Sequence, residues 1–477
     1  MIDRESLKKG VAVYGGLTVL AIVTRFYGLG EGSILKDEMF TALYFEERYT
    51  GAIAPLYYAL VELSTEVFGV NRWAFRFPAA VLGAVSIPTF YYLVKRVLNP
   101  ATALIGSVFL VFNPWHLHYS QNARFYSGVL LFGLMAYFLF FYALRRESYW
   151  ILSASILASA VSFLFHPTAI FLVASCGTYA LFVLIRERWA GRENHVAEVY
   201  FGVCLLAGVV LSPFLFGIAT DWIAQYSRAV SGGGAQSLTD LVYSSGVELA
   251  RLSYRVFDYT GLTLIAGAFF GLLLSYRRDS YEGVFLLLSV AVPLLVLATL
   301  SQLLPAVRPR YVFYTVPVFV AGAAYLSSEW YNAYRDFPVV SGAVVSVLIV
   351  SMLPGFVSHY TAQSSLQVED AINVVEKRYS DGDLVVAHER DAIYKISADH
   401  PDLELEKAWG EDWKKTAQKV SREGNRVWFI MNSSCVPGVL NELESWLIDH
   451  ASLVWRRHRK GFVHGLTGYE VWVMEAK

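Results

Sequence analysis

Long apolar segments recur along most of this chain, and they constrain its fold more than any other feature. A helix of about 18–22 apolar residues crosses the ~30 Å hydrocarbon core of a bilayer. The composition agrees, because 55% of the 477 residues are hydrophobic and only 17% are charged. About eleven segments have the required character: 10–28, 74–94, 101–118, 126–144, 149–166, 168–186, 199–219, 260–276, 283–304, 311–328 and 338–357. The sequence therefore predicts a mainly α fold, a polytopic transmembrane helix bundle.

Basic residues are unevenly distributed between the loops, and this asymmetry predicts the orientation. Loops rich in lysine and arginine face the cytoplasm. The residues that mark this side are Lys8, Lys9, Lys95, Arg96, Arg145, Arg146, Arg186, Arg188, Arg192, Arg277, Arg278 and Arg335. We therefore predict a multi-pass protein of a prokaryotic cell membrane, with the first loop and the C-terminus outside. The net charge of -1 gives no indication of nucleic-acid binding.

The composition changes at about residue 361, where charged residues become frequent and spanning runs end. Alternating strands and helices are typical of a small α/β domain. Strands are expected at 383–388, 426–431 and 468–475, and amphipathic helices at 367–380 and 436–450. We predict two domains: a transmembrane domain at 1–360 and an extracytoplasmic soluble α/β domain at 361–477.

A third kind of helix is expected in the first outward loop, at 55–69. Leu56, Leu60, Leu63 and Val67 fall on one helical face. Such a helix lies in the membrane interface or packs as a short soluble helix on the bundle, and the pattern favours the interface. A long outward loop is expected at 220–258. The three cysteines suggest neither a disulfide nor a metal site.

Polar groups are few on the outward side, and they gather where spans end. Asp37 and Glu38 follow the first apolar segment. Adjacent carboxylates there form either a solvated loop or a polar site, because entry into hydrocarbon is costly. Carboxylates beside arginines suggest a pocket for a phosphorylated lipid, since the guanidinium fork donates two hydrogen bonds to phosphate. The outward arginines are Arg76, Arg124, Arg308 and Arg310.

At these residues the chain resembles the GT-C superfamily of membrane glycosyltransferases, in its protein O-mannosyltransferase and aminoarabinose-transferase-like branch. The shared pattern is a sequence of short motifs in a fixed order. They are Asp37-Glu38, 55-PLYY-58, 68-FGVNRWAFR-76, 114-PWHLHYSQNARFY-126, His166 and 309-PRYVFYTVP-317.

The resemblance implies a polyprenyl-phosphate-linked sugar as donor and a usually inverting reaction on the outer face. It implies that Asp37 is the base on the acceptor and that Arg124 holds the donor phosphate. Asp37 and Glu38 are the predicted catalytic residues. The predicted substrate-binding residues are Arg124, Tyr126, Arg76, His166, Arg308, Arg310 and Tyr57.

Departures from the family pattern bear on a metal and on the acceptor. Some members place a metal near the first loop, but Ile53 and Ala54 stand where many relatives have a histidine. No cofactor is therefore certain, and a divalent metal is left as an alternative. The WWD-type motif of oligosaccharyltransferases is absent from the sequence, which argues against transfer of whole glycans to asparagine.

The predicted function is a membrane glycosyltransferase that moves one sugar to an extracytoplasmic protein, lipid or glycan. The alternative from another class is a transporter or flippase of lipid-linked sugars. Transporters usually place polar groups near the midplane of repeated halves, whereas the acids here lie in an outward loop. A receptor whose function lies in 361–477 would leave the upstream motifs unexplained.

Overall fold

The structure is a computed structural model that describes residues 4–31, 38–45, 53–229, 262–278, 280–300, 309–363, 367–387, 402–407, 412–432, 446–461 and 465–474. The chain forms two compact units. The helical unit comprises Met1–Leu29 and Gly51–Phe356, and the C-terminal unit comprises Gly30–Thr50 and Val357–Lys477. The sequence predicts a single boundary at 360, whereas in the structure the segment Gly30–Thr50 also belongs to the C-terminal unit.

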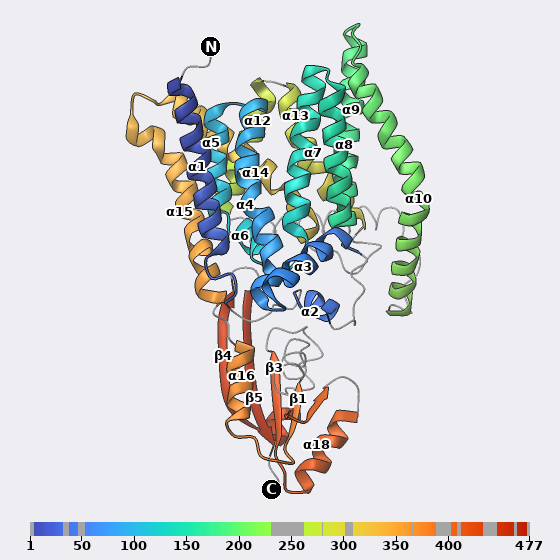
Figure 1. Ribbon diagram of the computed structural model, residues 1–477, viewed down its shortest axis with the longest axis vertical. Coiled ribbons are helices and arrows are strands. Elements are labelled where there is room, and N and C mark those ends of the chain that lie inside the picture. Colours follow the sequence, from blue (N-terminus) through green and yellow to red (C-terminus); the bar gives the residue numbers. More distant parts are fainter. Residues whose placement is uncertain are drawn as a thin grey trace. The chain divides into compact units, whose positions relative to one another are not determined.

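The helical unit is a bundle whose long helices run side by side (Figure 1). Its elements are α1 (Arg4–Phe26), α3 (Pro55–Phe68), α4 (Arg72–Val97), α5 (Pro100–Phe112), α6 (Pro114–Ser120), α7 (Tyr126–Arg146), α8 (Tyr149–Phe165), η1 (Pro167–Ala169), α9 (Ile170–Trp189), α10 (His195–Ala229), α12 (Leu262–Arg278), α13 (Ser280–Leu300), η2 (Pro309–Thr315), α14 (Val316–Ala333) and α15 (Pro338–Gln363). Among the described residues, each of the eleven predicted apolar segments is largely helical.

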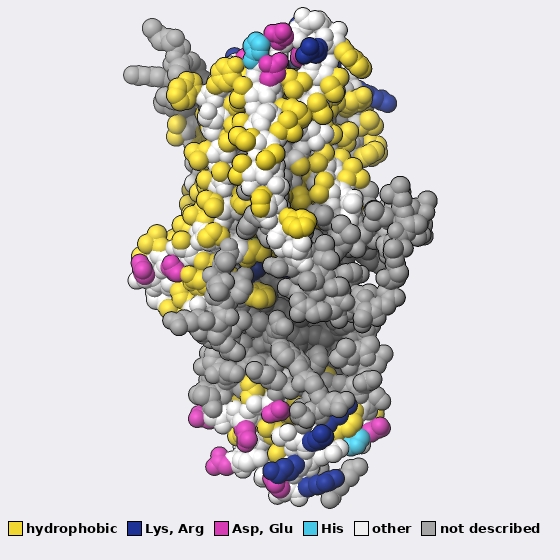
Figure 2. Space-filling view, turned by 90° about the vertical axis from the view of Figure 1, so that its right-hand side faces the viewer, with side chains coloured by type: hydrophobic (Ala, Val, Ile, Leu, Met, Phe, Trp, Pro, Cys, Tyr) yellow, Lys and Arg dark blue, Asp and Glu magenta, His cyan; other side chains and the backbone are white. Residues whose placement is uncertain are grey.

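Six of the described helices are long and apolar enough to cross a membrane. Five further apolar helices are shorter. Apolar side chains such as Val19, Val209 and Val350 point outward with more than half of their surface exposed. Figure 2 shows hydrophobic side chains along the outer face of the helical unit, with a group of charged side chains at one end. These features identify a multi-pass membrane protein, while the number of spans stays a prediction.

Asparagine side chains begin several of these helices. The Oδ1 atoms of Asn71, Asn99 and Asn113 accept hydrogen bonds from backbone N–H groups three residues later, at 2.8–2.9 Å. Such a cap satisfies one of the backbone donors that a helix leaves free in its first turn. The caps of α5 and α6 are followed directly by Pro100 and Pro114, whose fixed φ suits the first helical position. Local sequence therefore sets these helix starts.

The predicted single span at 101–118 is wrong, because the chain breaks at Asn113 into α5 and α6. Pro114 has no N–H to continue the helix, and the Asn113 side chain starts a new one. The predicted loop at 220–258 is also wrong at its start, because α10 continues to Ala229. The rest of that loop lies outside the described residues.

Helix α3 lies across the bundle rather than along it (Figure 1). It packs on α4 and α8 through a face that includes Tyr57, Tyr58 and Val61. Its opposite face exposes the apolar side chains of Leu63 and Val67. An apolar face that is not covered by protein suits a helix in the membrane interface, as the sequence pattern favours.

Two glycines allow α12 and α14 to approach closely. A Cβ built at Gly271 on α12 would overlap the backbone oxygen of Gly322 on α14. Small residues permit this kind of backbone contact between helices in membranes. One turn earlier, a Cβ at Gly267 would lie 3.4 Å from the Leu348 side chain, which is an ordinary contact.

Gly271→Ala is therefore expected to destabilise the helical unit by about 1–3 kcal/mol, the usual cost of overpacking. The measurement is thermal unfolding of the purified full-length protein in detergent. Gly267→Ala is the matched control on the same helix and should leave the unfolding temperature nearly unchanged. Equal stability of the two variants would contradict the close approach.

The C-terminal unit contains a five-stranded sheet in the order β2-β1-β3-β5-β4. Strand β1 pairs in parallel with β2 and β3, whereas β5 pairs antiparallel with β3 and β4. The elements are α2 (Met39–Phe45), α16 (Gln367–Glu376), β1 (Leu384–Ala387), β2 (Leu405–Lys407), α18 (Asp412–Arg422), β3 (Val427–Asn432), β4 (Ser452–Gly461) and β5 (Gly465–Met474). The structure confirms the three predicted strands and the helix at 367–380, which ends earlier, at Glu376.

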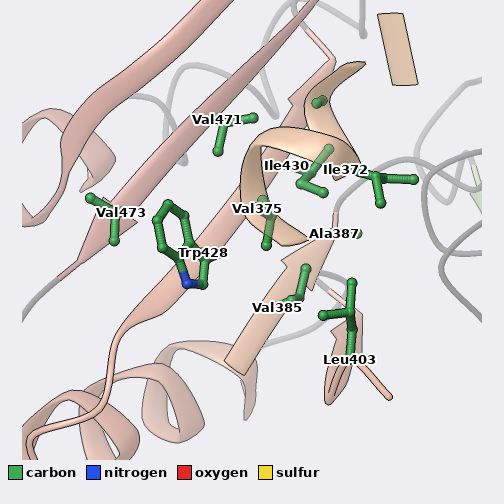
Figure 3. Close-up of a cluster of buried hydrophobic side chains, with 10 residues drawn as sticks. Ile372, Val375, Val385, Ala387, Leu403, Trp428, Ile430, Val471 and Val473 are labelled. Carbon is green, nitrogen blue, oxygen red and sulfur yellow. The ribbon is translucent and has the colours of Figure 1, made fainter. Parts of the chain in front are cut away.

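Both faces of this sheet carry buried apolar side chains, as expected where helices cover parallel strands. One core joins Ile372 and Val375 of α16 to Val385, Trp428 and Val473 of three strands, as Figure 3 shows. A second core lies on the other face and includes Ala417 of α18. The sequence analysis did not predict β2, β4 or α18. Most of the predicted helix at 436–450 lies outside the described residues, which include its last turn from Trp446 to His450.

A buried carboxylate fixes the start of β1 against β3. Asp383 accepts hydrogen bonds from the Arg426 backbone N–H at 2.9 Å and from the Trp428 Nε1–H at 3.0 Å. It also pairs with the Arg426 guanidinium at 3.0 Å. Burial alone would raise the pKa of Asp383, but the hydrogen bonds from Trp428, Arg426 and Ser380 outweigh it and lower the pKa.

Asp383→Asn is expected to destabilise the C-terminal unit by about 1.5–3 kcal/mol, the range for a hydrogen bond to a charged group. Since the folded-state pKa is below the unfolded value, the stabilisation is present above the unfolded pKa and is lost as the pH falls through the folded pKa. Hydrogen exchange of β1 and β3 peptides in the full-length protein measures the effect. Asp381→Asn, at an exposed position, is the control. Equal exchange in both variants would contradict the role of Asp383.

Candidate active site

The turn between α6 and α7 is the centre of the candidate site. All residues from Tyr119 to Tyr126 are buried. The Gln121 side chain donates to the backbone oxygens of Arg25 at 3.1 Å and Tyr27 at 2.8 Å. The Ser127 hydroxyl donates to the Tyr119 oxygen at 2.8 Å. These bonds fix the turn to the end of α1 and to the start of α7, so its side chains have defined positions.

Arg124 is held within this turn by a hydroxyl and a ring. Its Nη1 donates to the Tyr58 hydroxyl at 3.4 Å. Its guanidinium lies 4.6 Å from the centroid of the Phe125 ring, within the range of a cation–π contact. The side chain is only 9% exposed. The structure thus brings the predicted phosphate ligand beside the second tyrosine of the PLYY motif.

His166 lies next to this turn. It follows α8 and precedes η1, between the apolar helices Tyr149–Phe165 and Pro167–Trp189, and its ring stacks on Phe125 with centroids 4.3 Å apart. The ring centroids of Tyr311 in η2 and Tyr126 in α7 lie 5.8 and 6.4 Å from that of His166. Burial, and then the charges of Arg124 and Arg310, lower the pKa of His166 to about 3. Both arginines are therefore close enough to act on the imidazole, which stays neutral near pH 7.

Arg76 and Tyr57 are buried and make structural contacts. Arg76 Nη1 donates to the Leu29 oxygen at 3.1 Å and so joins α4 to the chain after α1. The Tyr57 hydroxyl donates to the Phe75 oxygen at 3.1 Å. Tyr57 also packs against Tyr58 and Phe125. These two residues support the turn that carries Arg124.

Asp37 and Arg308 lie outside the described residues. Glu38 belongs to the C-terminal unit, and its backbone oxygen accepts from Thr41 at the start of α2. The Glu38 residue is 1% exposed, so it is not the solvated loop acid that one reading of the sequence offered.

A buried polar network that the sequence analysis did not predict supports the same turn. Arg25 is fully buried and donates to the Val111 oxygen at 2.8 Å and to the Leu110 oxygen at 2.9 Å. It also donates to Nδ1 of His116 at 2.7 Å, so the opposite ring nitrogen carries the proton and donates to Ser86 at 2.8 Å. Arg25 thereby caps the end of α5, where the span breaks.

One signal in the sequence could have revealed this network. Arg25 lies inside an apolar segment, and an ionisable residue there normally has a specific partner. A histidine at the membrane interface would contact lipid headgroups. His116 and His118 are instead only 1% and 7% exposed. Both belong to the protein interior because the break at Asn113 directs α6 inward.

The basic pairs lie at the opposite end of the same helices. Arg145 and Arg146 end α7, whereas Tyr126 begins it. Arg145 pairs with Glu282 at the start of α13, and the Arg186 guanidinium lies 4.0 Å from the Tyr281 ring centroid. These contacts gather the basic ends of α7 and α9 at one end of the bundle. The site around Arg124 lies at the other end.

The site residues in the helical unit do not fit a metal. Among the described residues, no group of three or more histidine, cysteine or carboxylate side chains could hold an ion. The charged neighbours that act on His166 are the cations Arg124 and Arg310. A cationic surrounding favours an anionic ligand over a divalent metal.

Part of the chain is similar to a known protein family. A model of the dolichyl-phosphate-mannose-protein mannosyltransferase family matches residues 53–216. The Bacillus subtilis (strain 168) protein named "Putative mannosyltransferase YkcB" is 24% identical over 213 residues. This match covers 45% of the chain but only 27% of the length of that relative. The matched segment contains Tyr58, Arg124 and His166.

Solved structures share the fold. ArnT from Cupriavidus metallidurans in the apo state is similar over 98% of each chain, with a TM-score of 0.51 and 11% identity. The oligosaccharyltransferase AglB from Archaeoglobus fulgidus, in complex with an inhibitory peptide and a dolichol-phosphate, has a TM-score of 0.53 and 12% identity. That similarity covers 87% of this chain and 69% of AglB. Residues 53–216 therefore match a mannosyltransferase family model, in line with the resemblance seen in the motifs, and the chain shares the fold of ArnT and AglB.

Proposed function

We propose that this protein transfers one sugar from a polyprenyl-phosphate carrier to an acceptor outside the cytoplasm. The observation that carries the proposal is the position of Arg124, buried between Tyr58 and Phe125 inside the segment that matches a mannosyltransferase family. The dolichol-phosphate in the complex of AglB supports a lipid phosphate as the donor's leaving group. The acceptor is a protein, lipid or glycan hydroxyl.

In the proposed mechanism Asp37 is the general base and transfer inverts the anomeric centre. Asp37 takes the acceptor proton as the hydroxyl oxygen attacks the anomeric carbon. The bond from that carbon to the phosphate oxygen breaks, and its electron pair leaves with the polyprenyl phosphate. Arg124 and Arg310 stabilise this growing negative charge, which matters most where water is excluded. Arg308 and Tyr126 complete the proposed substrate site, and Arg76 and Tyr57 support the turn that carries Arg124.

The orientation forms part of the proposal. Lysine and arginine pairs mark the end of the bundle that faces the cytoplasm, so the end with Arg124 faces outside. The C-terminal unit is also proposed to lie outside, as the sequence predicts. A transporter of lipid-linked sugars is not favoured, because the polar groups gather at one end of the bundle rather than near its middle.

The test is transfer by purified full-length protein in lipid nanodiscs with labelled polyprenyl-phosphate sugars. We expect release of polyprenyl phosphate together with a labelled acceptor. In proteoliposomes, movement of intact lipid-linked sugar between leaflets without bond cleavage would favour the transporter. Absence of both release and binding for a panel of such donors would reject the proposed substrate class.

A further inference from the structure

The hydrogen bonds of His166 determine which of its ring nitrogens carries a proton. The Thr168 backbone N–H donates to Nδ1 at 3.2 Å, and the Thr168 hydroxyl lies 2.9 Å from the same nitrogen. A backbone N–H is always a donor, so Nδ1 must be the unprotonated acceptor. In a neutral imidazole the single proton then lies on Nε2.

Aromatic neighbours fix the plane of this ring. Phe125 stacks on the imidazole with an interplanar angle of 15°. Tyr311 lies nearly parallel to it, at 21°. His166 is only 6% exposed. The ring therefore has little freedom to rotate, and Nε2–H points in one direction.

The Nε2–H group has no acceptor among the residues that the structure describes, whereas Nδ1 is fully engaged. The residue is not fully enclosed, since 6% of its surface stays accessible. Arg124 and Arg310 both act electrostatically on the ring. Two cations and an available N–H donor at one place suit an anion with several oxygen atoms, such as a phosphate.

We propose that His166 is a neutral hydrogen-bond donor, protonated on Nε2, to the phosphate oxygen of the lipid-linked sugar, and that it never accepts the acceptor's proton. This role rests on the proposed function and assigns a new part to one residue of its site. As the bond to the anomeric carbon breaks, negative charge on the phosphate increases and the Nε2–H bond strengthens. The acceptor proton goes to Asp37, and His166 keeps its own.

The first experiment observes the tautomer directly. Full-length protein labelled with ¹⁵N-histidine is studied by NMR in nanodiscs, and the spectrum of His166→Gln assigns the resonance among the ten histidines. We expect a neutral ring with the proton on Nε2 that does not titrate from about pH 5 to pH 8.5. A proton on Nδ1, or titration near the ordinary histidine pKa, would overturn the proposal.

The same sample tests the ligand. Polyprenyl phosphate is expected to shift the His166 Nε2–H resonance to lower field, as a hydrogen bond to an oxyanion does. Inorganic phosphate at equal concentration distinguishes a general anion site from a site for the lipid-linked phosphate. A shift with inorganic phosphate alone would assign the contact to free phosphate and overturn the lipid-linked role.

Variants test the role in transfer. His166→Phe keeps the aromatic stacking but has no donor, and we expect kcat to fall by about 10²-fold, the low end for loss of one preorganised donor. His166→Gln keeps an N–H near the position of Nε2 and should stay within about tenfold of wild type. His195→Phe, at an exposed histidine on α10, is the matched control and should not change kcat.

The pH profile separates the two chemical roles of a histidine. If His166 only donates, the profiles of wild type and His166→Gln have the same shape. Loss of one limb of the profile in His166→Gln would identify a proton acceptor and contradict the proposal. Wild-type kcat in His166→Phe would remove the contact from the mechanism.

These outcomes also distinguish this inference from the proposed function. If the wild type transfers sugar but His166→Phe is unimpaired, the role of His166 alone fails. If the wild type neither binds polyprenyl phosphate nor transfers sugar, the proposed function fails, and the contact to the lipid phosphate fails with it.

Discussion

Asp37→Asn is expected to reduce sugar transfer by about 10²–10⁴-fold, the usual contribution of general-base catalysis. Asparagine keeps the shape and hydrogen bonding of aspartate but cannot take the proton of the attacking hydroxyl. A sugar or peptide hydroxyl is a weak nucleophile until that proton leaves. The measurement is transfer at equal amounts of folded protein and at saturating donor.

Several controls separate the loss of a base from other causes. Donor binding should survive in Asp37→Asn, because Asp37 is proposed to act on the acceptor. Glu38→Gln should cost less, since Asp37 and not Glu38 is proposed to take the acceptor proton. If Asp37→Asn retains more than about a tenth of wild-type transfer, another carboxylate is the base.

Arg124→Ala is expected to lower kcat by about 10²–10³-fold, the range for one donor that stabilises developing charge. The guanidinium is buried against Tyr58 and Phe125, so water does not screen its interaction with a leaving phosphate. Arg124→Lys should recover only part of the activity, because lysine keeps the charge but loses the two-pronged donor geometry. Steady-state kinetics with varied donor measure both variants.

Arg145→Ala is the matched control for Arg124. Arg145 pairs with Glu282 at the opposite end of the bundle, where no contact with donor is expected. Its replacement should leave transfer unchanged, since partly exposed ion pairs contribute little to stability. Equal losses in Arg124→Ala and Arg145→Ala would point to folding rather than to phosphate binding.

The helices were largely predictable because their signals are local. An apolar run of sufficient length forms a helix in lipid, since no other open structure satisfies its backbone there. Asn71 and Asn99 mark helix starts for the same local reason. The prediction failed at Asn113, because two apolar runs look like a single span in the sequence. In the structure Asn113 followed by Pro114 begins a new helix there.

The sheet of the C-terminal unit was only partly predictable. Strands β1 and β3 are short apolar runs, and both are interior strands of the sheet. Strand β2 has only three residues, too few for an alternating pattern to be recognised. Strand β4 contains four basic side chains, Arg456, Arg457, Arg459 and Lys460, and charge obscures the pattern of a strand at the edge of a sheet.

The sequence by itself determined the helical character of this protein, the asparagines that cap its helices and the order of its motifs, because these depend on neighbouring residues. Only the tertiary structure decided that Arg25 caps α5 through Leu110 and Val111, and that Phe125 stacks on His166. The protonation of His166 follows from the turn that Thr168 closes. Residues far apart in sequence meet only when helices pack, and the position and direction of a hydrogen-bond donor are fixed only then.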